Sequence, residues 1–141
     1  MGQSQPLKRW PVLIVEDEPI LRIDAISMVE DAGFEAVEAM SSADAVTLLE
    51  ERLDIRLVYM DLDMPRSRKG IEIAAAIRKR WPPIEIILTA AYFTRESVSL
   101  PERAEFYPKP IDRFEIVDAM RRLMERPIAE AEAPGNLTGA S

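Results

Sequence analysis

The sequence contains neither cysteine nor histidine. Without cysteine, the chain has no disulfide bond and no thiol nucleophile. Without histidine, it has no imidazole general base, no imidazole metal ligand and no phosphohistidine of its own. Any chemistry that the protein performs must therefore come from carboxylates, hydroxyl groups and lysine.

Long hydrophobic runs and blocks of positive charge are also missing. No apolar stretch approaches the roughly 20 residues of a membrane-spanning helix, and Met1–Arg9 is polar, without the apolar centre of a secretory signal. The net charge is −7 and no cluster of lysine and arginine stands out, which argues against binding to nucleic acid or to an anionic membrane. Together with the lack of cysteine, these features favour a cytoplasmic location.

The length of 141 residues suffices for one domain with a substantial core and is too short for two ordinary domains. From residue 127 onward the chain is rich in alanine and glutamate and contains no aromatic residue, which is typical of a flexible tail. We therefore expect an N-terminal extension over residues 1–9, one domain over residues 10–126 and a tail over residues 127–141.

Five short segments have the pattern of β-strands. The first and the third are unbroken apolar runs, as in strands buried on both faces, and the second alternates between apolar and polar residues. The predicted strands are Val12–Val15, Glu35–Met40, Leu57–Met60, Ile84–Leu88 and Ala104–Tyr107.

Apolar residues at helical spacing separate these strands. Helices are predicted from about Pro19 to Gly33, Ser41 to Arg52, Gly70 to Trp81, and from Asp112 onward. Residues 92–100 form at best a short helix. The alternation of strands and helices predicts an α/β domain with a doubly wound, five-stranded parallel sheet, in which the fourth crossover is short or irregular.

Polar residues stand where the predicted strands end. The carboxyl ends of parallel strands meet at one edge of the sheet, where ligands commonly bind. The residues expected at this edge are Glu16, Asp17, Asp61, Asp63, Thr89 and Lys109. Carboxylates packed there would repel one another by about 4 kcal/mol per pair at ~4 Å and an effective dielectric near 20. A divalent cation would remove that cost, and Mg²⁺ suits a ligand set made only of oxygen.

A metal ion, an ammonium group and a hydroxyl around a carboxylate form a site for a phosphoryl group. At these positions the chain resembles the receiver domains of bacterial two-component response regulators. The likeness covers about Trp10 to Glu125. It rests on four motifs in order, Ile14–Pro19, Met60–Pro65, Leu88–Ala90 and Pro108–Pro110, and it implies a flavodoxin-like fold of the CheY type.

The resemblance implies that Asp61 accepts a phosphoryl group from the phosphohistidine of a sensor histidine kinase or a histidine phosphotransfer protein. It also implies that Mg²⁺ is held by Glu16, Asp17, Asp61 and the main-chain carbonyl of Asp63. We expect no enzymatic activity beyond self-phosphorylation and self-dephosphorylation. The side chain of Asp63 is expected to affect the lifetime of the phosphorylated state.

Thr89 and Lys109 are implied to contact the phosphoryl oxygens, and Phe106 occupies the position of the family's switch aromatic residue. Because no output domain follows, we expect a stand-alone regulator. It would signal by contact with an unknown downstream protein or by a phosphorelay. The apolar residues Ile20 and Leu21 of the first helix are expected to dock the phosphodonor.

A haloacid-dehalogenase-like phosphatase is one alternative. Asp61 and Asp63 would then be its nucleophile and general acid. That family places its acidic metal pair downstream of the lysine, whereas in this chain the pair lies upstream, at Glu16 and Asp17.

A pseudo-receiver, which keeps the fold only as a docking module, is a second alternative. The loop from Asp61 to Gly70 is one residue longer than is usual in the family and carries Lys69 before the glycine. The segment from Thr89 to Lys109 is about two residues shorter than usual and contains Pro101. Each site residue also has a plain structural interpretation when taken alone: Glu16 and Asp17 as charge at a helix start, Thr89 as a strand-end hydroxyl, and Phe106 as core.

Overall fold

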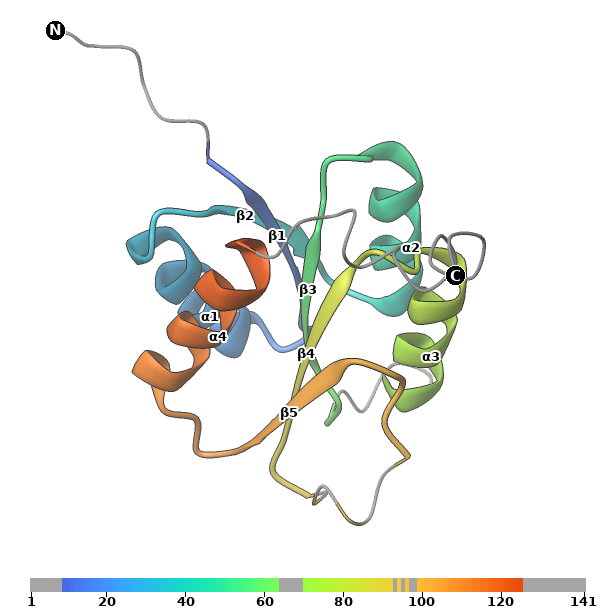
Figure 1. Ribbon diagram of the computed structural model, residues 1–141. Helices are drawn as coiled ribbons and strands as arrows, with labels where there is room; N and C mark the ends of the chain where they lie inside the picture. Colours follow the sequence, from blue (N-terminus) through green and yellow to red (C-terminus); the bar gives the residue numbers. More distant parts are fainter. Residues whose placement is uncertain (1–8, 64–69, 93, 95, 97–98, 126–141) are drawn as a thin grey trace, which may run out of the picture.

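The computed structural model describes residues 9–63, 70–92, 94, 96 and 99–125. Its strands form one parallel sheet in the order β2-β1-β3-β4-β5, with β3 in the centre (Figure 1). The strands are β1 (Pro11–Val15), β2 (Glu35–Ala39), β3 (Leu57–Asp61), β4 (Glu85–Ala90) and β5 (Ala104–Pro108). The α-helices within the described residues are α1 (Pro19–Asp31), α2 (Ser42–Glu51), α3 (Gly70–Arg80) and α4 (Arg113–Glu125). The predicted doubly wound parallel sheet is confirmed.

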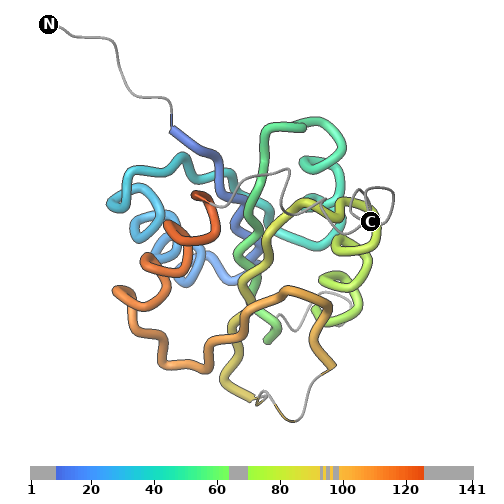
Figure 2. Tube along the Cα trace, viewed as in Figure 1, coloured from blue at the N-terminus to red at the C-terminus, as the bar shows by residue number. Residues whose placement is uncertain are grey.

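The helices cover the two faces of the sheet in pairs. Helices α1 and α4 lie on one side and α2 and α3 on the other, as the ribbon and the Cα trace both show (Figures 1 and 2). Successive side chains of a strand point to opposite faces. In β3, Leu57 and Tyr59 therefore belong to the core under α1 and α4, whereas Val58 and Met60 belong to the core under α2 and α3.

The helix starts are set by side chains that accept hydrogen bonds from free backbone N–H groups. Glu18 Oε1 accepts bonds from the backbone nitrogens of Ile20 (2.9 Å) and Leu21 (3.2 Å) at the start of α1. Ser41 Oγ accepts one from the backbone nitrogen of Asp44 at the start of α2 (3.1 Å). The last acid of the Glu16–Glu18 run therefore serves as a helix cap.

The fourth crossover connects β4 to β5 without an α-helix among its described residues. Arg78 of α3 anchors the connection at its far end, because its Nε donates to the carbonyl of Glu102 (2.8 Å). The same guanidinium also donates to the carbonyl oxygens of Pro82 (2.8 Å) and Ile84 (2.5 Å). The expectation of an irregular fourth crossover is thus confirmed, and one half-buried arginine ties it to the base of the sheet.

Some predictions lie outside the described residues. These are the longer loop at Arg66–Lys69, most of the N-terminal extension and the tail over residues 127–141. Within the described part of the chain, no helix is long and apolar enough to span a membrane.

Candidate functional site

The carboxyl ends of the central strands meet around one cavity of about 350 Å³. Glu16 follows β1, Asp61 ends β3, Thr89 lies near the end of β4, and Lys109 follows β5; all four line this cavity. Helix α1 and the connection from β5 to α4 form its walls. The parallel topology therefore brings together side chains that are up to 93 residues apart in the sequence, from Glu16 to Lys109.

The closest charged contact in the site joins Lys109 to Asp61. Lys109 Nζ donates to Asp61 Oδ2 at 2.8 Å, and the backbone nitrogen of Asp63 donates to Asp61 Oδ1 at 2.8 Å. Burial by itself would lower the pKa of Lys109, but the hydrogen bond to Asp61 and the charges of Asp61, Asp63 and Glu16 together raise it. Asp61 is only 5% exposed, so a fixed ammonium charge faces a buried carboxylate.

Glu16 and Asp61 form a second close pair, made of two acids. Glu16 is 6% exposed. Its pKa is raised to about 8, first by burial, then by its hydrogen bond to Asp61 and the charge of Asp61. The backbone nitrogen of Glu18 donates to Glu16 Oε2 at 3.1 Å and opposes this shift. At neutral pH, Glu16 therefore carries a proton that it shares with the Asp61 carboxylate.

This shared proton bears on the predicted Mg²⁺ site. Within the described residues, no three acidic side chains are already gathered as a metal site. Magnesium commonly binds through one or two carboxylates and keeps several waters, so the Glu16–Asp61 pair, with half-buried Asp17 beside it, fits a hard divalent cation. Such a cation would replace the proton that the two carboxylates share.

Asp63 lies two residues after Asp61 and reaches the end of β4 and Lys109. Its Oδ2 lies 3.5 Å from Lys109 Nζ and accepts a hydrogen bond from the backbone nitrogen of Ala91 at 2.6 Å. Its Oδ1 is buried and has no hydrogen-bond partner among the described residues. The side chain of Asp63 thus competes with Asp61 for the charge of Lys109.

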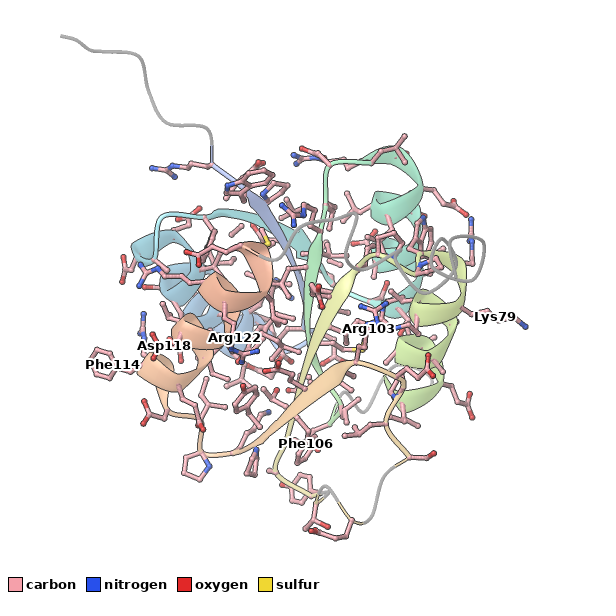
Figure 3. The ribbon with its side chains drawn as sticks, in the orientation of Figure 1. Lys79, Arg103, Phe106, Phe114, Asp118 and Arg122 are labelled. Atoms are coloured by element: carbon pink, nitrogen blue, oxygen red, sulfur yellow. The ribbon has the colours of Figure 1, made fainter. Side chains whose placement is uncertain are left out.

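Thr89 and Phe106 lie on opposite faces of the sheet. Thr89 is the register partner of Asp61, is 2% exposed and lines the cavity under α1 and α4. Phe106, labelled in Figure 3, is also 2% exposed and packs into the core under α2 and α3, where Leu88 is its register partner. A coupling between these two residues would therefore have to pass through the end of β4.

Tyr59 is a cavity residue that the sequence pattern did not single out. It is 7% exposed and lines the same cavity as Thr89. Burial, followed by the negative charges of Asp61 and Glu16, raises its pKa, so its hydroxyl is protonated. The available signal was a hydroxyl group in an otherwise apolar strand, two residues before Asp61 and therefore on the same face.

Arg22 is a second residue that sequence reasoning missed. Its Nη1 donates to the main-chain carbonyl of Glu16 at 3.0 Å, and its Nε lies 3.4 Å from Glu38 Oε1. The first turn of α1 thereby holds the loop that carries Glu16 and Asp17.

Apolar side chains are exposed beside the cavity. Ile20, Leu21 and Ile23 of α1 are exposed, as is Phe114 at the start of α4, which points outward in Figure 3. Leu21 also lines the cavity. The apolar residues predicted to dock a phosphodonor therefore lie at the surface.

Comparison with known proteins identifies the family. The model of the response regulator receiver domain matches residues 12–121. The chain is 38% identical over 124 residues to the transcriptional regulatory protein PdtaR of Mycobacterium tuberculosis, a match that covers 82% of this chain and 57% of PdtaR. It is 29% identical over 122 residues to the sensor kinase CckA of Brucella abortus, covering 82% of this chain and 12% of CckA.

A solved structure supports the same assignment. The response regulator protein TrrA of Thermotoga maritima, in complex with Mg²⁺-BeF, superposes with a TM-score of 0.70 at 28% identity, covering 80% of this chain and 97% of TrrA. The chain spans little more than half of PdtaR and a small part of CckA, so the likeness concerns one domain of those proteins. Over residues 12–121 this chain belongs to the response regulator receiver domain family.

Proposed function

We propose that this receiver accepts a phosphoryl group on Asp61 from the phosphohistidine of a sensor histidine kinase or a histidine phosphotransfer protein. The contact between Lys109 Nζ and Asp61 Oδ2 at 2.8 Å is the observation that supports this most strongly. It places a positive charge beside the carboxylate that would receive the phosphoryl group. A carboxylate oxygen of Asp61 attacks phosphorus and the P–N bond breaks. The imidazole, whose other ring nitrogen carries a proton, leaves with the donor as a neutral ring.

Electrostatic stabilisation of the arriving group supplies the rest of the mechanism. Lys109 lines the cavity with its side chain 24% exposed and is positioned to neutralise a phosphoryl oxygen. Glu16, Asp17, Asp61 and the main-chain carbonyl of Asp63 would hold Mg²⁺. When bound, this ion would neutralise negative charge on the phosphoryl oxygens.

Thr89 and Phe106 would transmit phosphorylation of Asp61 to the surface of the domain near the ends of β4 and β5. The hydroxyl of Thr89, opposite Asp61 in the sheet register, donates to a phosphoryl oxygen in this proposal. The movement would alter the end of β4 and then the environment of Phe106 in β5. The phosphoryl group adds nearly two negative charges at this edge, which provides the driving force.

The partners follow from the surface beside the cavity. We propose that the exposed apolar residues of α1, Ile20 and Leu21, with Phe114 of α4, contact the phosphodonor. The signal would then pass to a downstream protein by direct contact or to a second histidine by a phosphorelay.

The receiver is favoured over the phosphatase that the sequence also allowed. The first three acidic residues downstream of Lys109, candidates for the phosphatase metal pair, are Asp112, Glu115 and Asp118. None of these three is among the described residues that line the cavity with Asp61. The acids close to Asp61 are instead Glu16 and Asp63.

Intact-mass measurement after incubation with acetyl phosphate and Mg²⁺ tests the proposal. The wild-type chain is expected to gain one phosphoryl group, and Asp61→Asn should gain none. Asp118→Asn, which changes an exposed acid on α4, is the matched control and should be labelled like the wild type. Equal labelling of Asp61→Asn would contradict the assignment. In a separate assay, multiple turnover of a phosphate ester would favour the phosphatase. No labelling of the wild type by acetyl phosphate would favour the docking module.

A further inference from the structure

Arg22, in the first turn of α1, folds back onto the loop that follows β1. Its Nη1 donates to the main-chain carbonyl of Glu16 at 3.0 Å, and its side chain is only 14% exposed. The backbone nitrogen of Glu16 donates to the carbonyl of Ala39 on β2 at 3.1 Å. Both polar groups of the Glu16 backbone are therefore bonded, one to the sheet and the other to the side chain of Arg22.

The Glu16 carbonyl belongs to the peptide group that joins Glu16 to Asp17. Because a peptide group is planar, a bond that holds its oxygen also limits the direction in which the chain continues to Asp17. Glu16 and Asp17 are the two acids of this loop that are proposed to hold Mg²⁺. The relative position of these two acids therefore depends on a peptide plane that Arg22 holds.

Glu38 of β2 holds the guanidinium group of Arg22 in turn. In the register of β1 with β2, Glu38 is opposite Ile14, which belongs to the core under α1 and α4. Glu38 therefore faces α1, and its Oε1 lies 3.4 Å from Arg22 Nε. The carboxylate also offsets the positive charge of Arg22, which by itself would oppose the binding of a cation nearby.

We propose that Arg22 is a positioning residue for the Mg²⁺ site of this receiver. It fixes the peptide between Glu16 and Asp17 and thereby the relative position of the two acids, and Glu38 keeps the guanidinium group in the required orientation. The inference rests on the proposed Mg²⁺ site at Glu16 and Asp17. Arg22 itself is not a ligand of the ion.

A Mg²⁺ titration of the ¹⁵N-labelled full chain, followed by the amide signals of the loop, tests the proposal. Arg22→Met removes both contacts and the charge but keeps a long side chain. It should weaken Mg²⁺ binding about tenfold, the lower end of the effect of groups that orient metal ligands. Loss of a positive charge by itself would act in the opposite direction and strengthen Mg²⁺ binding. The direction of the change therefore separates positioning from charge.

Two further variants test the order of the contacts. Arg22→Lys keeps the charge and a donor but lacks the planar fork that bonds two acceptors, so it should lose less affinity than Arg22→Met. Glu38→Gln should weaken Mg²⁺ binding about threefold, the effect of a partly exposed ion pair. In the Arg22→Met background, Glu38→Gln should cause no additional loss, because Glu38 acts only through the guanidinium group.

Arg121→Met is the matched control. Arg121 Nη2 also donates to a main-chain carbonyl, that of Ala32 at the other end of α1, at 3.1 Å. Neither residue is among those that line the cavity. This control should leave Mg²⁺ affinity unchanged. Thermal melting without Mg²⁺ checks that each variant folds, and Arg22→Lys replaces Arg22→Met if the latter does not.

Labelling by acetyl phosphate adds a second measurement. In Arg22→Met, the Mg²⁺ concentration that gives half of the maximal labelling rate should rise about tenfold. The labelling rate at saturating Mg²⁺ should equal that of the wild type, because only the binding of the ion is weakened. A general disturbance of the fold would lower the saturating rate as well, and that result would contradict a positioning role.

The outcomes distinguish this inference from the proposed function. If the wild type binds no Mg²⁺, the proposed metal site fails and the inference fails with it. If Mg²⁺ binds and Asp17→Asn weakens its binding, the proposed metal site stands.

The role of Arg22 alone would then be overturned by unchanged or tighter Mg²⁺ binding in Arg22→Met, or by an equal loss in the Arg121→Met control. An effect of Glu38→Gln that is the same with and without Arg22→Met would also overturn it. Failure of both Arg22 variants to fold would do so as well, because Arg22 would then maintain the fold as a whole.

Discussion

Asp63 Oδ2 accepts a hydrogen bond of 2.6 Å from the backbone nitrogen of Ala91, and so joins the turn after β3 to the first residue after β4. The same oxygen lies 3.5 Å from Lys109 Nζ. The carboxylate of Asp63 thus accepts from a backbone N–H and partly neutralises the ammonium group of Lys109, at the edge of the sheet where Asp61 lies. Both groups are suited to bind phosphoryl oxygens.

Removing the charge of Asp63 is expected to lengthen the lifetime of phosphorylated Asp61 severalfold. Asp63→Asn removes a negative charge close to the phosphoryl group, which itself carries nearly two negative charges. The ammonium group of Lys109 can then interact with the phosphoryl group without competition from Asp63. Asp63→Ala should prolong the lifetime further, because it also frees the Ala91 nitrogen. The measurement is the decay of the phosphorylated mass after removal of acetyl phosphate, with Asp118→Asn as control. A half-life equal to that of the wild type in both variants would exclude the side chain of Asp63 from the mechanism.

Loss of the lysine charge should destabilise the domain in the absence of Mg²⁺. Lys109→Ala leaves Asp61 buried beside Glu16 and Asp63 without an ammonium partner, and we expect a loss of about 1–3 kcal/mol in the free energy of unfolding. Added Mg²⁺ should raise the melting temperature of this variant at least as much as that of the wild type. Lys79→Ala, at an exposed position of α3 labelled in Figure 3, should have little effect. A Lys109→Ala variant as stable as the wild type would contradict the importance of this ion pair.

Stability without metal should depend on pH through Glu16. Its pKa is about 8 in the folded domain against 4.5 for an ordinary glutamate, so between these values the folded state holds a proton that the unfolded state has released. The stabilisation of the folded state by protonated Glu16 is complete below pH 4.5 and is lost as the pH rises through about 8. Urea unfolding in the presence of a chelator should show this decline. Glu16→Gln should show a flatter profile, and an identical slope in both proteins would refute the assignment.

Mg²⁺ should reverse this pH dependence in part, because the ion favours ionised Glu16. Its stabilising effect on the wild type should therefore grow as the pH rises from ~6 toward the Glu16 pKa of about 8. Asp17→Asn should reduce the effect at every pH. Melting temperatures measured with and without Mg²⁺ at each pH provide the comparison, and a wild-type melting temperature that never responds to Mg²⁺ would exclude a metal site here.

Gly70, the first residue of α3, should not tolerate a side chain. A Cβ atom at this position would lie 2.9 Å from Leu62 Cδ2 and 3.1 Å from Leu62 Cα, which belongs to the turn after Asp61. Alanine normally favours a helix over glycine by about 1 kcal/mol, but we expect Gly70→Ala to destabilise the domain by about 1–3 kcal/mol through this overpacking. Chemical denaturation measures the change. A variant more stable than the wild type would contradict this prediction, because it would mean that the turn at Leu62 moves and makes room for the methyl group.

Much of the site could be predicted from the sequence because it depends on topology. Apolar runs that alternate with helical patterns specify a parallel sheet, and a parallel sheet places all strand ends of one kind at one edge. Asp61, Thr89 and Lys109 therefore had to converge once their strands were recognised. The start of α2 could also be predicted from the capping pattern of Ser41 with Asp44, since capping depends only on neighbouring residues.

Contacts across strands were decided by the tertiary structure alone. The strand pattern of β3 places Tyr59 on the same face as Asp61, but only the register with β4 shows that this face also carries Thr89, beside the same cavity. The acids after β1 looked alike in sequence, yet Glu18 caps α1 while Glu16 is buried against Asp61. The physical reason is that burial and the distance between charges depend on which strands are neighbours and how far each side chain reaches. Those quantities set the protonation of Glu16, and they are properties of the assembled sheet.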